Sequence, residues 1–143
     1  MIALNVVGLA IAARVVGEPA TLGVHDGRLA DCPASPNCVS THANPDDREH
    51  YMAPLPLSGS AEAAAARIRA ALAAEPKTAI VRDDGTYIHA VARSQLMDYP
   101  DDVEFLIDTN AGLIHFRSAS RLGYGDGGVN RARMERITHA NAP

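Results

Sequence analysis

Seven polar residues with ligand-binding chemistry recur in two stretches of the chain, residues 78–93 and 103–118. They are three arginines, two histidines, a tyrosine and a glutamate: Arg82, Tyr87, His89, Arg93, Glu104, His115 and Arg117. The planar guanidinium of arginine can donate two parallel hydrogen bonds to a carboxylate or a phosphate. Histidine gains a positive charge as the pH falls through about 6.5, which would strengthen the binding of an anion. If the fold gathers these side chains on one surface, we expect that surface to bind a small acidic ligand.

Both stretches have the pattern of β-hairpins. In TAIVRDDGTYIHAVARS, Asp84 and Gly85 separate two β-prone runs, which is typical of a two-residue turn. In VEFLIDTNAGLIHFRS, residues 109–112 form the expected turn. The candidate residues therefore lie on four predicted strands.

Each turn predicts a register, because opposed residues of a hairpin project from the same face of the sheet. In the second hairpin, Phe105 would face Phe116 on an apolar side, and Glu104 would face Arg117 on a polar side. In the first hairpin, Asp83 opposite Thr86 would pair Val81 with Ile88 on one side. The other side would then carry the polar set Arg82, Tyr87, His89 and Arg93. On a solvated face the Glu104–Arg117 ion pair would contribute at most about 1 kcal/mol to the stability of the fold.

Two helices are expected to cover the apolar side of this sheet. The run SAEAAAARIRAALAAEP begins at Ser60, which can cap a helix, and stops at Pro76. A second helix is predicted over about residues 128–139. The sequence thus predicts an α+β fold, with an antiparallel sheet of at least four strands and helices packed on one face.

Residues 23–59 form a turn-rich, irregular segment, because its prolines restrict the preceding residues to extended geometry. The segment contains the only two cysteines, Cys32 and Cys38. Three interpretations remain open: a structural disulfide in an oxidising compartment, two reduced thiols in the cytoplasm, and a zinc site completed by a nearby histidine. A disulfide would close a small ring worth about 2 kcal/mol.

The run GYGDGG, residues 123–128, could form an anion-binding nest at the start of the last helix. It matches neither a P-loop nor a dinucleotide-binding motif. Asp126 can instead cap that helix, and its carboxylate would occupy the position that a phosphate needs. The sequence favours the capping turn.

Composition limits the class of protein. With 143 residues, 47% of them hydrophobic, the chain fits one globular domain, and its net charge of −4 argues against nucleic acid as a partner. The acidic cluster Asp101, Asp102 and Glu104 is more simply a charged strand end than a metal site, and no motif indicates a cofactor.

The apolar run at the N-terminus, residues 2–13, is too short for the roughly 20 residues that cross a bilayer, so we expect no integral membrane span. We divide the chain into residues 1–21, a possible remnant of an export signal or anchor, and residues 22–143, a single α+β domain.

The motifs CPASPNCVS, DDVEF and IHFRSASRLGYGDGGVNRARMERI closely resemble the bacterial and plastid family known as domain of unknown function 1499. The resemblance runs from about Leu22 to Ile137 and includes both cysteines, the acidic cluster and three arginines, Arg117, Arg121 and Arg131. It adds Arg121 to the candidate ligand-binding residues. Members of the family often follow a membrane segment or a transit sequence, but the resemblance implies no reaction.

Two function classes follow from these observations. The first is a non-catalytic binding or accessory module associated with the cell envelope, in the periplasm or at a membrane, with a cytoplasmic location as the alternative. Its partner would be a small anionic ligand or an envelope protein. The second is a small enzyme that uses the polar face through His89, His115, Arg117 and Glu104, although no recognisable nucleophile–base pair accompanies them. We favour the binding module and expect no cofactor and no metal.

Overall fold

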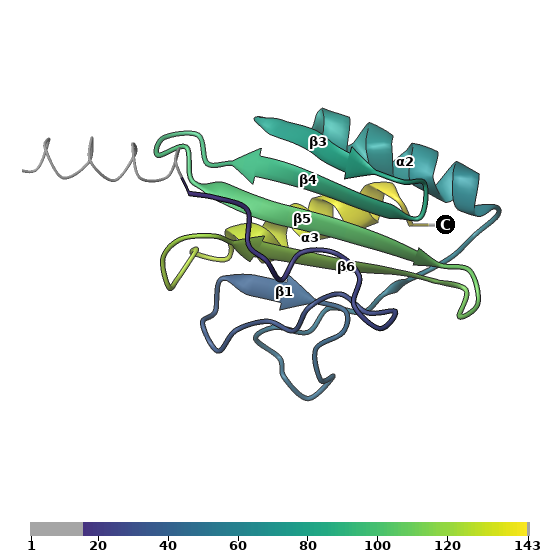
Figure 1. The fold of residues 1–143 in the computed structure, drawn as a ribbon, viewed down its shortest axis with the longest axis horizontal. Coiled ribbons are helices and arrows are strands. Elements are labelled where there is room, and N and C mark those ends of the chain that lie inside the picture. Colours follow the sequence, from purple (N-terminus) through teal and green to yellow (C-terminus); the bar gives the residue numbers. More distant parts are fainter. Residues whose placement is uncertain (1–15, 143) are drawn as a thin grey trace, which may run out of the picture.

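The protein is built around one antiparallel sheet, and the computed structural model describes residues 16–142 (Figure 1). The strands follow in the order β1-β6-β5-β4-β3, and β2 also pairs with β6. They are β1 Cys38–Ser40, β2 Leu55–Pro56, β3 Thr78–Asp83, β4 Tyr87–Arg93, β5 Pro100–Asp108 and β6 Leu113–Ser120. The apolar run 2–13 lies outside the described residues.

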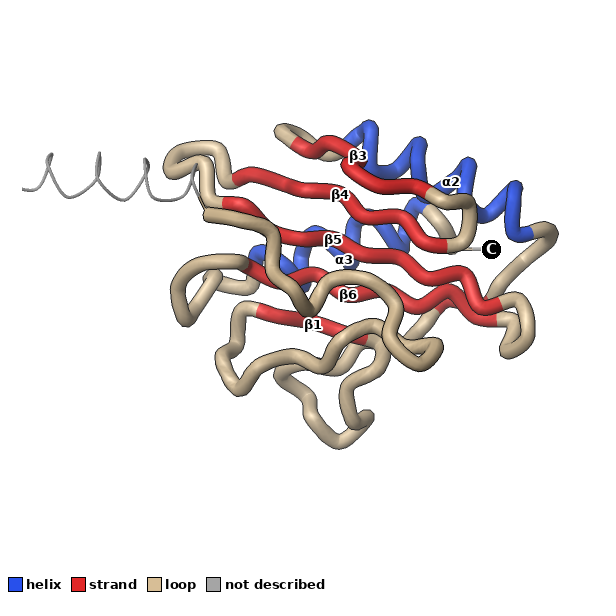
Figure 2. Tube along the Cα trace, viewed as in Figure 1, coloured by secondary structure: helices blue, strands red, loops and turns tan. Residues whose placement is uncertain are grey.

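Two helices, α2 Ala61–Ala74 and α3 Val129–Ala140, cover one face of the sheet (Figure 2). The first begins as predicted, because the Ser60 hydroxyl accepts a hydrogen bond of 3.0 Å from the backbone N–H of Ala63. The hydrophobic core lies between this helical layer and the sheet, and its largest members are Phe105, Phe116, Ile68, Leu72, Met134 and Ile137. The α+β fold class, with helices on one face of an antiparallel sheet, is confirmed.

The register predicted for the second hairpin is confirmed. Phe105 pairs with Phe116 towards the core, and Glu104 pairs with Arg117 on the opposite face. This hairpin could be aligned from sequence because its alternation of apolar and polar residues has no interruption.

The register predicted for the first hairpin is wrong. Asp83 pairs with Ile88 and Arg82 pairs with His89, so the turn is centred one residue later than the Asp84–Gly85 pair suggested. A β-bulge between Ile80 and Arg82 absorbs the shift, and Val81 is 56% exposed instead of packing against Ile88. A bulge leaves little trace in a pattern of alternating residues, and β3 is an edge strand whose outer side chains are weakly constrained.

The irregular segment 23–59 is attached to the sheet at several points. Its short strands β1 and β2 both pair with β6. A disulfide joins Cys32 to Cys38 with a Cα–Cα distance of 5.7 Å, which confirms the bridge among the three interpretations of the cysteines. Cys38 is fully buried on β1, so the bridge ties the chain that precedes β1 to the sheet.

We expect replacement of both cysteines by alanine to lower the free energy of unfolding by about 2 kcal/mol, because the ring no longer restricts the unfolded chain. Denaturant unfolding of the two proteins without reductant measures this difference. Wild-type protein treated with a thiol reductant should approach the stability of the variant, and equal stability of all three samples would contradict a structural role for the bridge.

Candidate functional site

The face of the sheet opposite the helices carries a set of buried polar side chains. Alternation along β4, β5 and β6 places Tyr87, His89, Asp102, Glu104 and Arg117 on this face. None of them is more than 6% exposed, and Glu104 is completely buried. Buried charges require partners, so the contacts of these residues determine what the face can do.

A cover over this face is formed by residues 16–37, here called the N-terminal arm, which crosses the sheet on the side away from the helices (Figures 1 and 2). Among its polar contacts with the sheet side, the backbone N–H of Gly23 donates to Glu104 Oε2 at 2.8 Å, Arg117 donates to the carbonyl of Asp31, and Arg121 donates to the carbonyl of Val16. The expectation of a solvated polar face is therefore wrong. The Glu104–Arg117 pair is buried, and its energetics are those of an internal ion pair.

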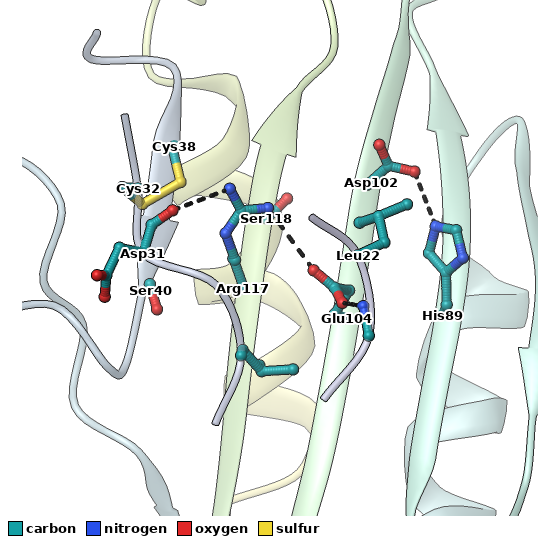
Figure 3. A network of polar contacts seen from close by, with 12 residues as sticks. Leu22, Asp31, Cys32, Cys38, Ser40, His89, Asp102, Glu104, Arg117 and Ser118 are labelled. Carbon is teal, nitrogen blue, oxygen red and sulfur yellow. Dashed lines mark hydrogen bonds and ion pairs between the residues drawn. A yellow bond between two sulfur atoms is a disulfide. The ribbon is translucent and has the colours of Figure 1, made fainter. Parts of the chain in front are cut away.

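One cluster in this layer joins His89, Asp102 and Arg121. Arg121 donates two hydrogen bonds to the Asp102 carboxylate, at 2.7 and 2.8 Å. His89 Nε2 donates to the same group at 2.7 Å, a contact that Figure 3 shows. Burial alone would raise the pKa of Asp102, but the hydrogen bonds from Arg121 and His89 outweigh it and leave that pKa below its ordinary value. The carboxylate is therefore ionised, and its charge is neutralised by Arg121.

The second cluster is centred on Glu104. The Tyr87 hydroxyl donates to Glu104 Oε2 at 2.6 Å, and the same oxygen accepts from Gly23. Burial raises the pKa of Tyr87, and the neighbouring carboxylate raises it further, so the phenol stays protonated and acts as a donor. The other oxygen, Oε1, accepts no hydrogen bond from residues 16–142 and lies 3.6 Å from Arg117 Nη1.

Arg117 has few hydrogen-bond partners for a buried guanidinium. Within residues 16–142 its one hydrogen bond runs from Nη2 to the carbonyl of Asp31, at 3.3 Å, and Nε has no partner (Figure 3). Arg121 and Arg133, which are similarly buried, each make three hydrogen bonds. Arg117 therefore retains unused donor capacity.

A cavity of about 330 Å³ lies between the N-terminal arm and the sheet beside this arginine, and we call it the arm cavity. The arm contributes Pro19, Thr21, Asp31, Cys32 and Pro33, whereas the sheet side contributes Asp102, Arg117, Ala119, Ser120 and Arg121. The disulfide and the two arginines thus line the same space.

The sequence-predicted ligand residues are only partly brought together. Arg117 and Arg121 line the arm cavity, and Tyr87, His89 and Glu104 lie buried beside it. Arg82 is stacked over the Tyr87 ring at 5.1 Å near solvent, Arg93 donates to the carbonyl of Asp98, and His115 stacks on His42. The charges of Arg121 and Arg117 are matched by carboxylates, because Asp102 and Glu104 face these two arginines.

Sequence reasoning missed two contributors to this site. Asp102 shares its face with Glu104 by simple alternation along β5. The sequence therefore contained this information, but the acidic cluster was interpreted as a charged strand end. The N-terminal arm had no such signal, because its contacts join residues far apart in the chain, such as Gly23 and Glu104.

A larger cavity, of about 430 Å³, lies at the start of α3 beside the GYGDGG run. The N-cap residue of α3 is Gly128 and not the predicted Asp126. The Asp126 carboxylate nevertheless accepts hydrogen bonds from the backbone N–H groups of Gly128 and Asn130, so it occupies the start of the helix as the sequence indicated. Burial alone would raise the pKa of Asp126, but the hydrogen bonds from Asn130 and Gly128 outweigh it and lower that pKa. Arg131 donates to three carbonyl groups of residues 48–51. An anion would therefore compete with a carboxylate already in place, and we do not assign a site there.

Residues 16–142 contain no group of three or more histidine, cysteine or acidic side chains arranged to hold a metal ion. In the same part of the chain, neither helix has the length and apolar character needed to cross a membrane.

The match to a family model covers most of the chain. The model described as "Protein of unknown function (DUF1499)" matches residues 28–140, a range that includes both cysteines and every sheet residue of the arm cavity. No curated protein and no solved structure gives a significant match.

One titratable pair fastens the N-terminal arm near this site. His42 stacks on His115 with ring centroids 4.0 Å apart, and His42 Nδ1 accepts a hydrogen bond from the backbone N–H of Leu29. Burial, followed by the charges of His115 and Arg28, lowers the pKa of His42 to about 4, although Asp31 and Asp108 act in the opposite direction. Burial also lowers the pKa of His115.

We expect the protein to lose stability as the pH falls from about 6.5 towards 4. The unfolded histidines bind protons near 6.5, whereas the folded pair resists protonation until lower pH, so acid favours unfolding in this window. Solvent at the partly exposed rings weakens the effect, and a loss of roughly 2 kcal/mol is expected. Denaturant unfolding at several pH values measures it.

The matched variant is His42→Asn, since an amide oxygen can still accept from Leu29 but does not titrate. It should flatten the pH dependence between 6.5 and 4. His50, whose pKa is raised by the Ser35 carbonyl and by Asp47 despite its burial, acts in the opposite direction in both proteins. An unchanged slope in His42→Asn would contradict the assignment.

Proposed function

Because the chain belongs to the DUF1499 family of proteins of unknown function, we propose its role from the arm cavity: a non-catalytic binding module that holds the acidic group of a small ligand on Arg117. The observation that carries the proposal is the shortage of hydrogen bonds to that buried guanidinium. Arg117 is 6% exposed and makes one long hydrogen bond within residues 16–142.

The energetics favour an acceptor beside Arg117. A guanidinium has five N–H donors, and leaving charged donors unsatisfied in a buried place is unfavourable by about 1–3 kcal/mol or more for each group. The Glu104 carboxylate, at 3.6 Å, is too far to accept a hydrogen bond. A ligand carboxylate or phosphate could supply short, charge-assisted hydrogen bonds in place of the 3.3 Å contact to Asp31.

The volume of the arm cavity supports a small ligand. At about 330 Å³ it lies at the lower end of the range for small-molecule pockets. Arg121 also lines the arm cavity, but its guanidinium already donates to Asp102 and to the carbonyl of Val16. Arg121 therefore stabilises the cavity wall and does not bind the ligand.

The alternative, a small enzyme using His89, His115, Arg117 and Glu104, has less support. A general acid or base must reach its substrate, but His89 is 1% exposed and Glu104 is buried under Gly23. His115 projects from the same face, but its ring stacks on His42 and its Nδ1 is hydrogen-bonded to the Thr41 hydroxyl.

We also propose that the protein works in an oxidising compartment at the cell envelope, with residues 22–143 as its single domain. The Cys32–Cys38 bridge supports this, since disulfides persist in such compartments and are rare in the cytoplasm.

The compartment can be tested by alkylation. In protein recovered from its native compartment without reductant, both cysteines should resist iodoacetamide, and the intact mass should match the bridged form. Two freely alkylated thiols would contradict the oxidising location.

The binding site can be tested by NMR titration of ¹⁵N-labelled protein with propionate, succinate and inorganic phosphate at constant ionic strength. We expect at least one acid to bind in the millimolar range, about 4 kcal/mol, and to shift the Arg117 Nε–H resonance and the amides that line the arm cavity. Arg117→Gln should abolish these shifts, because the guanidinium donors are removed.

Two further variants control for misfolding. Thr21→Phe places a bulky ring at the exposed rim of the arm cavity without touching the buried ion pairs, and it should also block binding. Arg67→Gln removes one positive charge from an exposed position on α2, behind the sheet, and should leave binding unchanged. Shifts that survive both Arg117→Gln and Thr21→Phe, or no shift with any acid, would overturn the proposal.

A further inference from the structure

The charges around the arm cavity do not favour a simple anion. Two cationic side chains, Arg117 and Arg121, face three carboxylates, Asp31, Asp102 and Glu104. Asp102 is neutralised by Arg121, and Glu104 lies against Arg117. These five side chains together carry one net negative charge, so the carboxylates weaken the attraction of Arg117 for a simple anion.

The unbalanced group is Asp31. Its side chain is exposed and takes part in no hydrogen bond or ion pair within residues 16–142, yet the residue lines the arm cavity. Its backbone carbonyl is the acceptor for Arg117 Nη2 at 3.3 Å. Asp31 and Arg117 both line the arm cavity, and Figure 3 shows the Asp31 carbonyl directed towards Arg117 and the Asp31 carboxylate directed away from it.

We infer that the ligand of the arm cavity is a small zwitterion of the α-amino-acid type, an inference that rests on the function proposed above. The ligand carboxylate binds the Arg117 guanidinium, and the ligand ammonium binds the Asp31 carboxylate at the rim. Such a ligand is neutral overall, so it gains both contacts without adding net charge to the site.

The remaining wall selects the size and polarity of the ligand. Pro19, Pro33 and Ala119 offer apolar surface beside the two charged groups. The volume of about 330 Å³ suits a free amino acid with a small apolar side chain. A ligand with a second carboxylate is disfavoured, because Asp102 and Glu104 would repel it.

The test uses three probes of nearly equal size. L-Alanine carries both charges, propionate lacks the ammonium group, and ethylammonium lacks the carboxylate. In NMR titrations of ¹⁵N-labelled protein near neutral pH and at constant ionic strength, we expect L-alanine to bind at least tenfold more tightly than propionate and ethylammonium not to shift the Arg117 Nε–H resonance.

Asp31→Asn separates the two contacts, because it removes the carboxylate but keeps the backbone carbonyl that contacts Arg117. The variant should bind L-alanine about tenfold more weakly than the wild type and propionate more tightly, since the site becomes neutral. Asp46→Asn, at an exposed loop position outside the arm cavity, is the matched control and should change neither affinity.

The outcomes separate the inference from the proposed function. Three results would overturn the inference of a zwitterionic ligand while leaving a ligand site at the arm cavity. They are equal affinities for propionate and L-alanine, an affinity for L-alanine that Asp31→Asn does not change, and binding of ethylammonium in the cavity. Failure of all three probes to shift any residue of the arm cavity would overturn both.

Discussion

The arrangement of the molecule depends on the burial of carboxylates along β5. Asp101, Asp102 and Glu104 are each at most 5% exposed, and a buried carboxylate is tolerated only when cations or N–H donors surround it. Because side chains alternate along a strand, Asp101 projects towards the helices and the other two towards the N-terminal arm. The acidic end of one strand therefore requires partners in both layers that cover the sheet.

The partners differ between the two faces. On the helical side, Arg133 of α3 donates to Asp101 at 2.7 Å and also to Ser118 and Asn130, so this network orients α3 on the sheet. Asn130 receives and donates further hydrogen bonds at the start of the same helix. On the other side, Asp102 accepts hydrogen bonds from both Arg121 and His89. In the described part of the chain, by contrast, Glu104 Oε1 and Arg117 Nε have no hydrogen-bond partner. The incomplete pair adjoins the arm cavity, which is why the candidate site lies there and not at the larger cavity beside α3.

The disulfide and the N-terminal arm cover the Glu104–Arg117 pair. The bridge ties Cys32 to β1, and that attachment keeps Asp31 over Arg117. Without the arm, the same side chains would be exposed to water, where an ion pair is weak and its donors are solvated. Covering them with irregular chain produces a small, partly open cavity with a charged wall, and binding sites often use such a combination of rigid strands and attached loops.

The amino-acid sequence by itself determined the features that depend on neighbouring residues. Ser60 and Pro76 delimit α2, the turn at residues 109–112 and unbroken alternation set the pairing of β5 with β6, and Asp126 accepts a hydrogen bond from the first turn of α3. Where a local irregularity intervened, as with the bulge in β3, the same reasoning failed by a small shift in register. Only the tertiary structure decided that the polar face is buried and that Arg117 is left with few partners. Those facts rest on contacts such as Gly23 with Glu104, 81 residues apart, and the periodicity of a sequence carries no information about which distant segment will lie over a given strand.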